Sequence, residues 1–220
     1  QLEFRVAGIL ARDPKIKQEV ESGFDVHAYT AQVLTNNGEP TERGPAKAST
    51  FRPLYGGTTG TPAQMSYFRE FFDKYQGVFQ WHIELQDQAI RTERVVTATG
   101  RQFEFPGVHR TRHGTASAKT QIVNYQVQSV ATAEIVPLGV IILHKTLIRM
   151  QLKSLVINTV HDSVLVDTHP DEIDIIKQVG PQCLLDAQQE ATDRFGIDPF
   201  IPLAVEMSKG KNWMEQEDFS

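Results

Sequence analysis

The sequence is poor in cysteine and lacks a long hydrophobic run. Cys183 is its single cysteine, which excludes an internal disulfide and agrees with a reducing compartment such as the cytosol. The longest apolar stretch, residues 135–143, contains Pro137 and Gly139 and falls short of the ~18 residues that span a bilayer. No signal or transit segment is visible. We therefore expect a soluble, cytoplasmic protein that has no membrane partner.

An excess of positive charge is also absent. The formal net charge is −5, which disfavours a nucleic-acid binder, because phosphate neutralisation needs Lys and Arg. The charges are unevenly distributed, however. Basic residues gather within residues 43–52 and 91–119, whereas acidic residues gather at 171–174 and 215–218. Because local charge matters more than the sum, a nucleic-acid site remains compatible with the composition.

Caps, glycines and prolines divide the chain into short elements. Four helices are expected to begin at cap or first-turn residues: Asp13, Asp25, Pro45 and Thr61. Further helices are expected after residue 77, at 116–150 with a kink at Pro137, and at 171–194. Apolar patterning predicts a strand leading into a helix at residues 2–9, and strands at 95–105 (a hairpin), 155–166 (a pair) and 203–207. A helix-rich middle between β-bearing ends indicates two lobes.

Two cations and two aromatic rings recur at intervals of four residues. They are Arg43, Lys47, Phe51 and Tyr55, and on a helix this spacing places them on one face. Such a face suits a nucleoside triphosphate, because cations bind phosphates and rings pack against sugar and base. An amphipathic helix with buried rings and solvated cations gives the same pattern, so both interpretations stay open at this point.

A polar triplet, His161-Asp162-Ser163, lies between two apolar strands. A tight turn there would project the Asp162 carboxylate out of the sheet, where a hard cation such as Mg²⁺ could use it. Asp and Ser are also ordinary turn residues, so the triplet alone does not identify a metal site.

Taken in order, these features resemble the family A DNA polymerases, and the resemblance runs from residue 1 to residue 213. Residues 43–57 resemble motif B, residues 1–6 the latter half of motif A, and residues 161–163 motif C. Residues 124–128 resemble the family's Asn-x-Pro-x-Gln helix start, and residues 209–213 its Gly-x-Asn-Trp ending. The wording of residues 50–57 resembles the phage branch, which would place the protein in a host cytoplasm.

The resemblance implies a nucleotide-binding set. Arg43 and Lys47 would hold the triphosphate, Phe51 would pack beside its sugar and base, and Tyr55 would stack at the template position. Lys47 is also the candidate for donating charge and a proton to pyrophosphate. Three further residues complete the set: Gln1 in the motif A block, Glu3 as the steric gate that rejects ribonucleotides, and His27, which would reach the triphosphate.

The resemblance also implies a DNA-binding and a metal-binding set. Asn124 and Gln128 would contact the minor groove near the primer end, and His161 would support that end. Asp162 would be a catalytic residue and a ligand of one of two Mg²⁺ ions. Three departures from the family pattern stand out: Ser163 where Glu is more frequent, Gln126 in place of the usual Pro, and Thr120 in place of a common Arg, with Lys119 beside it as a substitute.

The implied fold is an α+β right-hand polymerase with an antiparallel palm sheet and helical fingers. Residues 1–21 and 116–220 would belong to the palm, with the motif C hairpin at 154–169, and residues 22–115 to the fingers, with the motif B helix at 43–57. The implied reaction adds deoxynucleotides to a primer 3′-hydroxyl by two-metal nucleotidyl transfer. Its partners would be dNTPs, primer–template DNA, and a missing N-terminal part or a processivity factor.

Two alternatives remain open. A single-subunit RNA polymerase shares this architecture, but Glu3 disfavours it because a ribonucleotide needs room at its 2′ position. A non-catalytic, DNA-binding polymerase relic is disfavoured by the joint presence of Arg43, Lys47 and Asp162. The metal-binding Asp of motif A is expected three residues before Gln1, outside this chain. We therefore expect the isolated 220-residue fragment to be inactive.

Overall fold

Helices make up most of the chain, and several begin at the caps predicted from the sequence. The computed structural model describes residues 2–219. Asp13 accepts backbone N–H bonds at the start of α2 (Pro14–Glu21), and Asp25 does so for α3 (Val26–Asn36). Thr61 and Gln64 form a reciprocal capping box at the start of α5 (Pro62–Lys74). Local capping therefore sets where these helices begin.

The helix α4 (Arg43–Leu54) contains the cation and ring positions. It begins at Arg43, slightly before the helix start predicted around Pro45. Pro45 lies in its first turn, where a missing N–H is tolerated. Pro53 lies in its last turn, so the hydrogen bond that proline cannot donate is lost only at the helix end. Tyr55 caps the helix, and Gly56 follows at φ +78°, a left-handed conformation that favours glycine.

Two predicted strands are wrong. Residues 2–9 lie in the helix α1 (Leu2–Ala11), whose buried residues Val6, Ala7, Gly8 and Ile9 are consecutive and therefore cannot alternate between the two faces of a strand. A Cβ on Gly8 would come within 2.6 Å of the Ile16 side chain, so glycine permits the close contact between α1 and α2. Residues 203–207 form no strand, and the last strands are β5 (Ser208–Asn212) and β6 (Glu215–Asp218).

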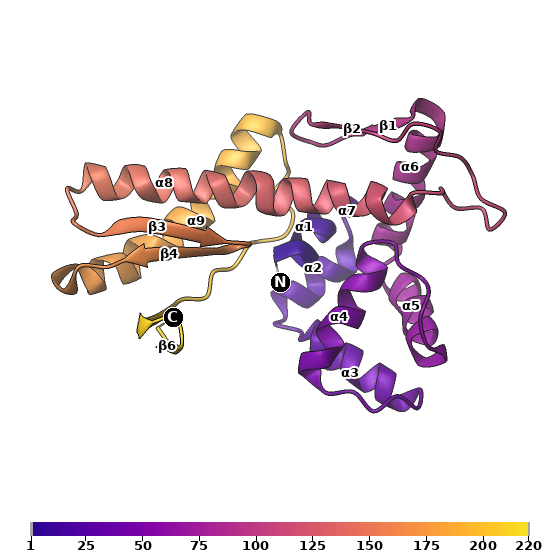
Figure 1. Cartoon of the computed structure of the whole chain (residues 1–220), viewed down its shortest axis with the longest axis horizontal. Helices are drawn as coiled ribbons and strands as arrows, with labels where there is room; N and C mark the ends of the chain where they lie inside the picture. The colour runs from indigo at the N-terminus through magenta and orange to yellow at the C-terminus, as the bar shows by residue number, and fades with distance from the viewer. Residues whose placement is uncertain (1, 220) are drawn as a thin grey trace. The chain divides into compact units, whose positions relative to one another are not determined.

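The first of two compact units comprises residues 3–129 and 200–202. It contains α1 to α5, α6 (Gln76–Thr92), the hairpin of β1 (Arg94–Val96) and β2 (Gln102–Glu104), and α7 (Lys119–Val130) (Figure 1). The predicted hairpin is confirmed, with Val95 opposite Phe103. Four aromatic side chains of α5 and its C-cap are fully or almost fully buried in this unit: Tyr67, Phe68, Phe71 and Tyr75.

The second unit comprises residues 130–199 and 203–219, together with Leu2. It contains a π-helical segment (Ala131–Ile135), α8 (Val136–Arg149), a 3₁₀ turn (Pro170–Glu172) and α9 (Ile173–Phe195). The helices α8 and α9 pack closely, because a Cβ on Gly139 would lie 2.9 Å from the Leu184 side chain. A π-helical segment ends just before Pro137, the residue at which the sequence predicts a kink.

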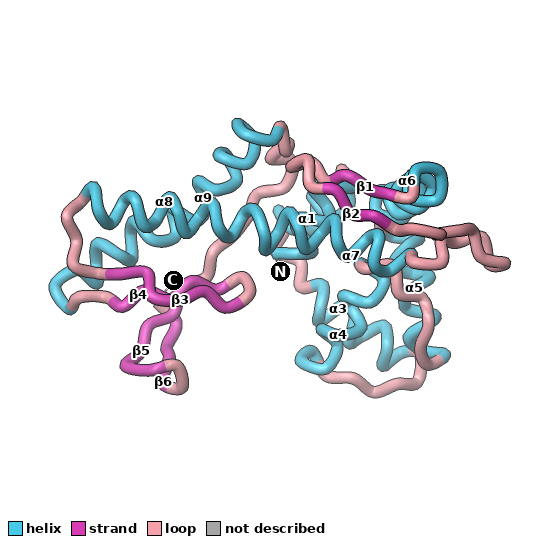
Figure 2. Tube along the Cα trace, turned by 45° about the horizontal axis from the view of Figure 1, so that its top comes forward, coloured by secondary structure: helices cyan, strands magenta, loops and turns pink. Residues whose placement is uncertain are grey.

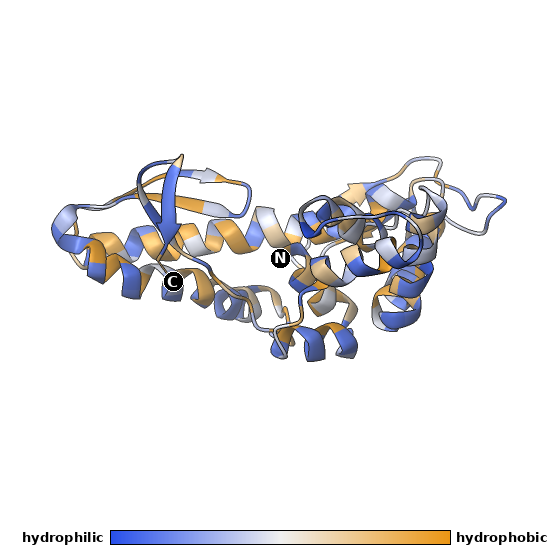
Figure 3. Ribbon diagram, turned by 90° about the horizontal axis from the view of Figure 1, so that it is seen from below, coloured by the Kyte–Doolittle hydropathy of each residue, from blue (hydrophilic) through white to orange (hydrophobic). Residues whose placement is uncertain are grey.

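The strands of the described residues form three separate two-stranded antiparallel sheets, and Figure 2 shows strands as magenta segments of the tube. In the second unit, β3 (Leu155–Val160) pairs with β4 (Ser163–Asp167), as predicted, with a register shift between Val156 and Asn158. The exposed β5–β6 hairpin is largely hydrophilic (Figure 3). Helices and antiparallel hairpins together give the predicted α+β class.

Residues Lys119–Arg149 form one continuous run of helix, which is long and apolar enough, by length and composition alone, to cross a membrane. Residues 135–143 led to the opposite expectation, because that stretch omits the helical residues on either side. Of the most apolar window of this helix, 39% is buried inside the protein. Core helices of proteins that have no membrane contact pass the same test, so the finding is weak evidence for a span.

Candidate nucleotide-binding site

The helix α4 presents the predicted cations and rings in the first unit. Arg43 and Lys47 are exposed, whereas Phe51 and Tyr55 are half-buried. The Phe51 and Tyr55 rings are nearly parallel, with centroids 6.1 Å apart and an interplanar angle of 16°. The helix therefore offers charge towards its N-terminus and flat apolar surface towards its C-terminus, which is the order a triphosphate and its nucleoside require.

Arg43 forms an ion pair that the sequence did not predict. Its Nε donates to Asp25 Oδ2 over 2.6 Å, and both side chains remain partly exposed. This hydrogen bond is the main cause that lowers the pKa of Asp25, with partial burial opposing it. The same carboxylate caps α3 through its other oxygen, so Asp25 joins the starts of α3 and α4.

His27, on α3, is buried beside the aromatic part of the α4 face. Its side chain is 4% exposed, and its ring centroid lies 5.6 Å from that of Phe51. Burial is the main cause that lowers the pKa of His27; the charges of Arg43 and Lys47 add to this effect, and Asp25 opposes it. His27 therefore lies in the positive field of the two cations, as expected for a residue that accompanies them at a triphosphate.

Tyr55, at the end of α4, forms a hydrogen bond with α7 and is affected by a charge on α1. Its hydroxyl accepts a hydrogen bond from Gln128 Nε2 over 3.0 Å. Burial and the negative charge of Glu3 raise the pKa of Tyr55 to about 12, against the opposing effect of Gln128. Glu3 is half-buried on α1. The first unit thus brings the proposed steric gate, the proposed template-stacking ring and one proposed minor-groove amide close together.

A second proposed minor-groove residue, Asn124, is half-buried on α7. Its Oδ1 is buried and has no hydrogen-bond partner within residues 2–219, although a buried polar atom usually has one. The side chain that replaces the usual Pro, Gln126, is also buried, and no described residue forms a hydrogen bond with its Nε2. These two buried atoms on α7 therefore keep unused hydrogen-bonding capacity.

The first unit contains a pocket of about 260 Å³, and Gly56, which follows the C-cap of α4, is one of its lining residues. Its apolar wall includes Phe72, Phe79 and Ile83, and Lys119 lies at its edge. His82 is among its lining residues, and no described residue forms a hydrogen bond with its buried Nε2 atom. Burial lowers the pKa of His82 to about 4, against the opposing effect of a hydrogen bond with the Leu54 backbone. The sequence did not predict this pocket.

The predicted catalytic carboxylate lies in the second unit. Asp162 and His161 form the two-residue turn between β3 and β4, closed by the pairing of Val160 with Ser163. His161 has φ +55°, a left-handed conformation that few residues other than glycine adopt. Both side chains are exposed, so the turn presents the Asp162 carboxylate to solvent as predicted.

Among the described residues, no group of three or more His, Cys, Asp or Glu side chains is arranged to hold a metal ion. Mg²⁺ needs fewer protein ligands than that, because it keeps several waters and is often bound through one or two carboxylates and substrate phosphates. The exposed carboxylate of Asp162 fits one such ligand position. Gln1, the remaining predicted site residue, lies outside the described residues.

Comparisons with known proteins identify one family. The model of "DNA polymerase family A" matches residues 1–215. DNA polymerase I of Treponema pallidum is 25% identical over 227 residues, covering 97% of this chain and 22% of that protein. DNA polymerase I of Lactococcus lactis subsp. cremoris is 26% identical over 231 residues, covering 98% and 25%. The chain thus spans about a quarter of the length of these curated relatives.

A solved structure shares the fold. It is the POL domain of Pol1 from M. smegmatis in complex with DNA primer-template and dNTP, and it superposes with a TM-score of 0.77 at 21% identity. The match covers 97% of this chain and 38% of that chain. The predicted α+β polymerase fold is therefore confirmed. The relatives named here are bacterial, so the resemblance to the phage branch stays a prediction.

Proposed function

Because the chain belongs to DNA polymerase family A, we propose that it supplies the nucleotide-binding and DNA-binding part of a template-directed DNA polymerase. The observation that carries this proposal is the α4 face, where two exposed cations precede two near-parallel rings beside His27. The proposed partners are dNTPs and primer–template DNA. The M. smegmatis neighbour, whose structure contains both, supports this choice.

The proposed reaction forms a bond between the primer O3′ and the α-phosphorus of the dNTP. The bond from that phosphorus to the bridging oxygen breaks, pyrophosphate leaves, and the hydroxyl proton is released. Arg43 and Lys47 hold the triphosphate and offset its charge, and Lys47 gives a proton to the leaving pyrophosphate. Asp25 holds the Arg43 guanidinium until phosphate oxygens replace its carboxylate as the partner.

The rings and amides position the base pair. Phe51 packs beside the sugar and base of the nucleotide, and Tyr55 stacks at the template position. Glu3 crowds the 2′ position, so a ribose hydroxyl is rejected. Asn124 and Gln128 donate to minor-groove acceptors, which are present in every base pair and so report pair geometry rather than sequence. His161 supports the primer end.

We propose Asp162 as a ligand of Mg²⁺, because its carboxylate is exposed at the tip of a tight turn. Two Mg²⁺ ions, when bound, would neutralise phosphate charge and lower the pKa of the primer hydroxyl. The division into palm (residues 1–21 and 116–220) and fingers (22–115) is part of the same proposal. So are a cytoplasmic location, a phage origin inferred from residues 50–57, and a processivity factor as a further partner.

The test is primer extension by the full-length protein that contains these residues. Asp162→Ala is expected to lower the extension rate by at least about 10³-fold, because Mg²⁺ would lose a protein ligand and with it the position from which it would offset phosphate charge in the transition state. Asp167→Ala is the matched control, because Asp167 is an exposed carboxylate on the same hairpin, at the end of β4. Equal rates for the two variants would refute the assignment of Asp162.

A further inference from the structure

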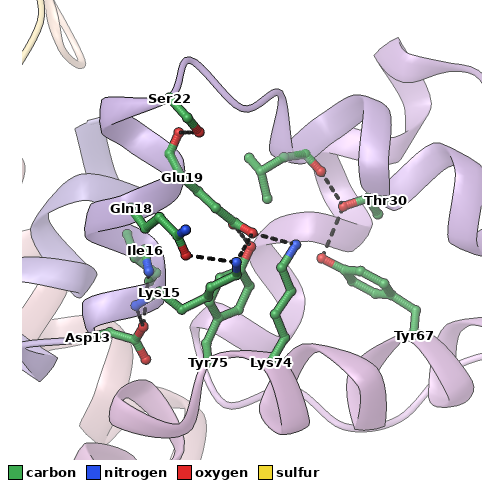
Figure 4. Close-up of polar contacts among 11 residues, drawn as sticks. Asp13, Lys15, Ile16, Gln18, Glu19, Ser22, Thr30, Tyr67, Lys74 and Tyr75 are labelled. Atoms are coloured by element: carbon green, nitrogen blue, oxygen red, sulfur yellow. Dashed lines mark hydrogen bonds and ion pairs between the residues drawn. The ribbon is translucent and has the colours of Figure 1, made fainter.

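A chain of buried hydroxyl groups leads from His27 into the first unit. Thr50 of α4, Thr30 of α3 and Tyr67 of α5 are each 0% exposed. His27 Nδ1 lies 3.1 Å from Thr50 Oγ1, and Thr50 Oγ1 donates to Thr30 Oγ1 over 2.8 Å. Thr30 Oγ1 forms a further hydrogen bond with the Tyr67 hydroxyl over 3.0 Å, as Figure 4 shows. One chain of hydrogen bonds therefore connects α3, α4 and α5.

The number of hydroxyl protons decides which form of His27 is present. Thr50 carries a single hydroxyl proton, and its oxygen donates to two acceptors, Thr30 Oγ1 and the carbonyl oxygen of Ala46 at 3.1 Å. Thr30 donates its own hydroxyl proton to the carbonyl oxygen of Val26 over 2.8 Å, so the contact between Thr50 and Thr30 needs the Thr50 proton, and none is left for His27. The contact between His27 and Thr50 is then a hydrogen bond only if Nδ1 carries the proton and donates it to Thr50 Oγ1.

The other ring nitrogen is therefore free to act on a ligand. Within residues 2–219, His27 Nε2 has no hydrogen-bond partner. In the neutral ring this atom bears a lone pair, which repels a phosphate oxygen. After protonation it becomes an N–H donor, and the ring gains a positive charge. A triphosphate would therefore bind His27 only together with a proton.

The charged groups around His27 agree with proton uptake on binding. Asp25 precedes it on α3, Arg43 and Lys47 face it from α4, and the phenol of Tyr67 lies at the far end of the hydroxyl chain on α5. The two cations and burial favour the neutral ring in the free protein. A bound triphosphate brings negative charge that offsets both cations, so the balance turns towards the protonated ring.

We propose that Thr50 is a positioning residue that holds His27 in its Nδ1–H form, so that Nε2 meets the triphosphate and takes up one proton when the nucleotide binds. This inference rests on the proposed function and deepens it, because it assigns one atom of His27 and a second residue to the triphosphate site. A buried hydroxyl on α4 thereby determines how a histidine on α3 binds phosphate.

The form of His27 can be measured without any change to Thr50. The full-length protein is labelled with ¹⁵N-histidine, and the His27 signals are identified by their loss in His27→Gln. The neutral ring is expected to show a protonated Nδ1 and an unprotonated Nε2, and saturating dATP is expected to protonate Nε2. A protonated Nε2 in the free, neutral ring would overturn the inference.

Matched variants test the role of Thr50 in binding. Between pH 7 and 9, where ionisation of the triphosphate is nearly complete, KM for dATP should rise by up to about tenfold per pH unit, with kcat changing less.

Thr50→Val keeps the shape of the side chain but removes the hydrogen-bond acceptor. Nε2 can then carry the proton of the neutral ring, and the pH dependence of KM should flatten. Thr50→Ser should restore it, and Ser49→Ala, which removes a neighbouring buried hydroxyl of α4, should leave it unchanged.

The outcomes separate this inference from the proposed function. If Thr50→Val and Thr50→Ser both keep the wild-type pH profile, Thr50 does not position His27, and the inference fails while polymerase activity stands. If Asp162→Ala retains full extension, the proposed function fails whatever the ¹⁵N signals of His27 show. If Thr50→Val does not fold, the ¹⁵N measurement on the unaltered protein still decides the form of the ring.

Discussion

Glu3 is half-buried on α1, and its charge acts on the phenol of Tyr55. Because a carboxylate there would crowd a ribose 2′-hydroxyl, Glu3→Ala should admit ribonucleotides. We expect the preference for dNTP over rNTP, measured as the ratio of kcat/KM values, to fall by about 10- to 200-fold, the range for one small steric contact. Glu42→Ala, at a helix start where the side chain makes no capping bond, is the control. An unchanged ratio in Glu3→Ala would contradict the steric gate.

Asp25 gives a residue-scale prediction of pH dependence. Its pKa in the folded protein lies below its ordinary value of 3.8, mainly through the hydrogen bond from Arg43. The ion pair therefore stabilises the fold above about pH 4 and stops doing so as pH falls through the lowered pKa. Asp25→Asn keeps the helix cap and loses the charge, so it should cost at most about 1 kcal/mol at pH 7. Urea unfolding should show this difference shrink as pH falls through the lowered pKa of Asp25, and a difference that does not change with pH would argue against the ion pair.

Single residues were predictable where their signal was local. Arg43, Lys47, Phe51 and Tyr55 were found because a spacing of four is visible in the sequence and α4 is a helix. The partners of these residues were not found. Asp25 pairs with Arg43 at a separation of 18 residues, and Gln128 contacts Tyr55 at a separation of 73. Such pairs depend on how helices pack, which a single sequence does not display.

At the scale of elements, caps predicted helix starts well, and hydrophobic patterning predicted strands less well. Asp13 caps α2 because its carboxylate reaches two free N–H groups within three residues, an interaction that is wholly local. Residues 2–9 were assigned to a strand because apolar residues alternate at its start. The same residues form α1, since packing against α2 and Ile201 buries four successive positions. Tertiary contact overrode the local pattern.

A buried carboxylate joins α2 to the end of α5, and its loss should weaken both. Glu19 is 5% exposed, accepts from the Tyr75 hydroxyl over 2.6 Å, and pairs with Lys74 over 2.8 Å, as Figure 4 shows. Tyr75→Phe removes one donor from a buried charge and should lower the free energy of unfolding by about 1–3 kcal/mol. Tyr125→Phe, at an exposed ring, should change it by less than about 0.5 kcal/mol. Equal free energies of unfolding in urea for the unaltered protein and Tyr75→Phe would show that the hydrogen bond from Tyr75 does not stabilise the buried Glu19 carboxylate.

At the scale of the whole molecule, the sequence indicated two lobes but not where they divide. The predicted boundaries followed motifs, whereas the compact units divide near residue 129, inside the helical run Lys119–Arg149. No glycine or proline cluster marks this division, because the helix continues through it. The predicted palm and fingers are functional regions, so their limits stay a proposal beside the observed units.

Binding of primer–template DNA by a chain of net charge −5 requires that its cations act locally. Arg112 and Arg110 lie in the exposed basic loop after β2. The Arg110 guanidinium pairs with the carboxylate of Asp87 over 2.6 Å, whereas Arg112 Nε donates to the uncharged acceptor His113 Nε2 over 3.1 Å. If the loop binds phosphates, the loss of each phosphate-binding cation should reduce the slope of log Kd against log salt by about 0.9.

Arg112→Gln should show that reduction in the slope. Arg110→Gln should show a smaller one, because Arg110 must break its ion pair with Asp87 to bind DNA. Fluorescence anisotropy between 50 and 200 mM salt, roughly the range where such slopes are measured, would reveal them. A larger effect of Arg110→Gln, or none in either variant, would exclude the loop from the DNA path.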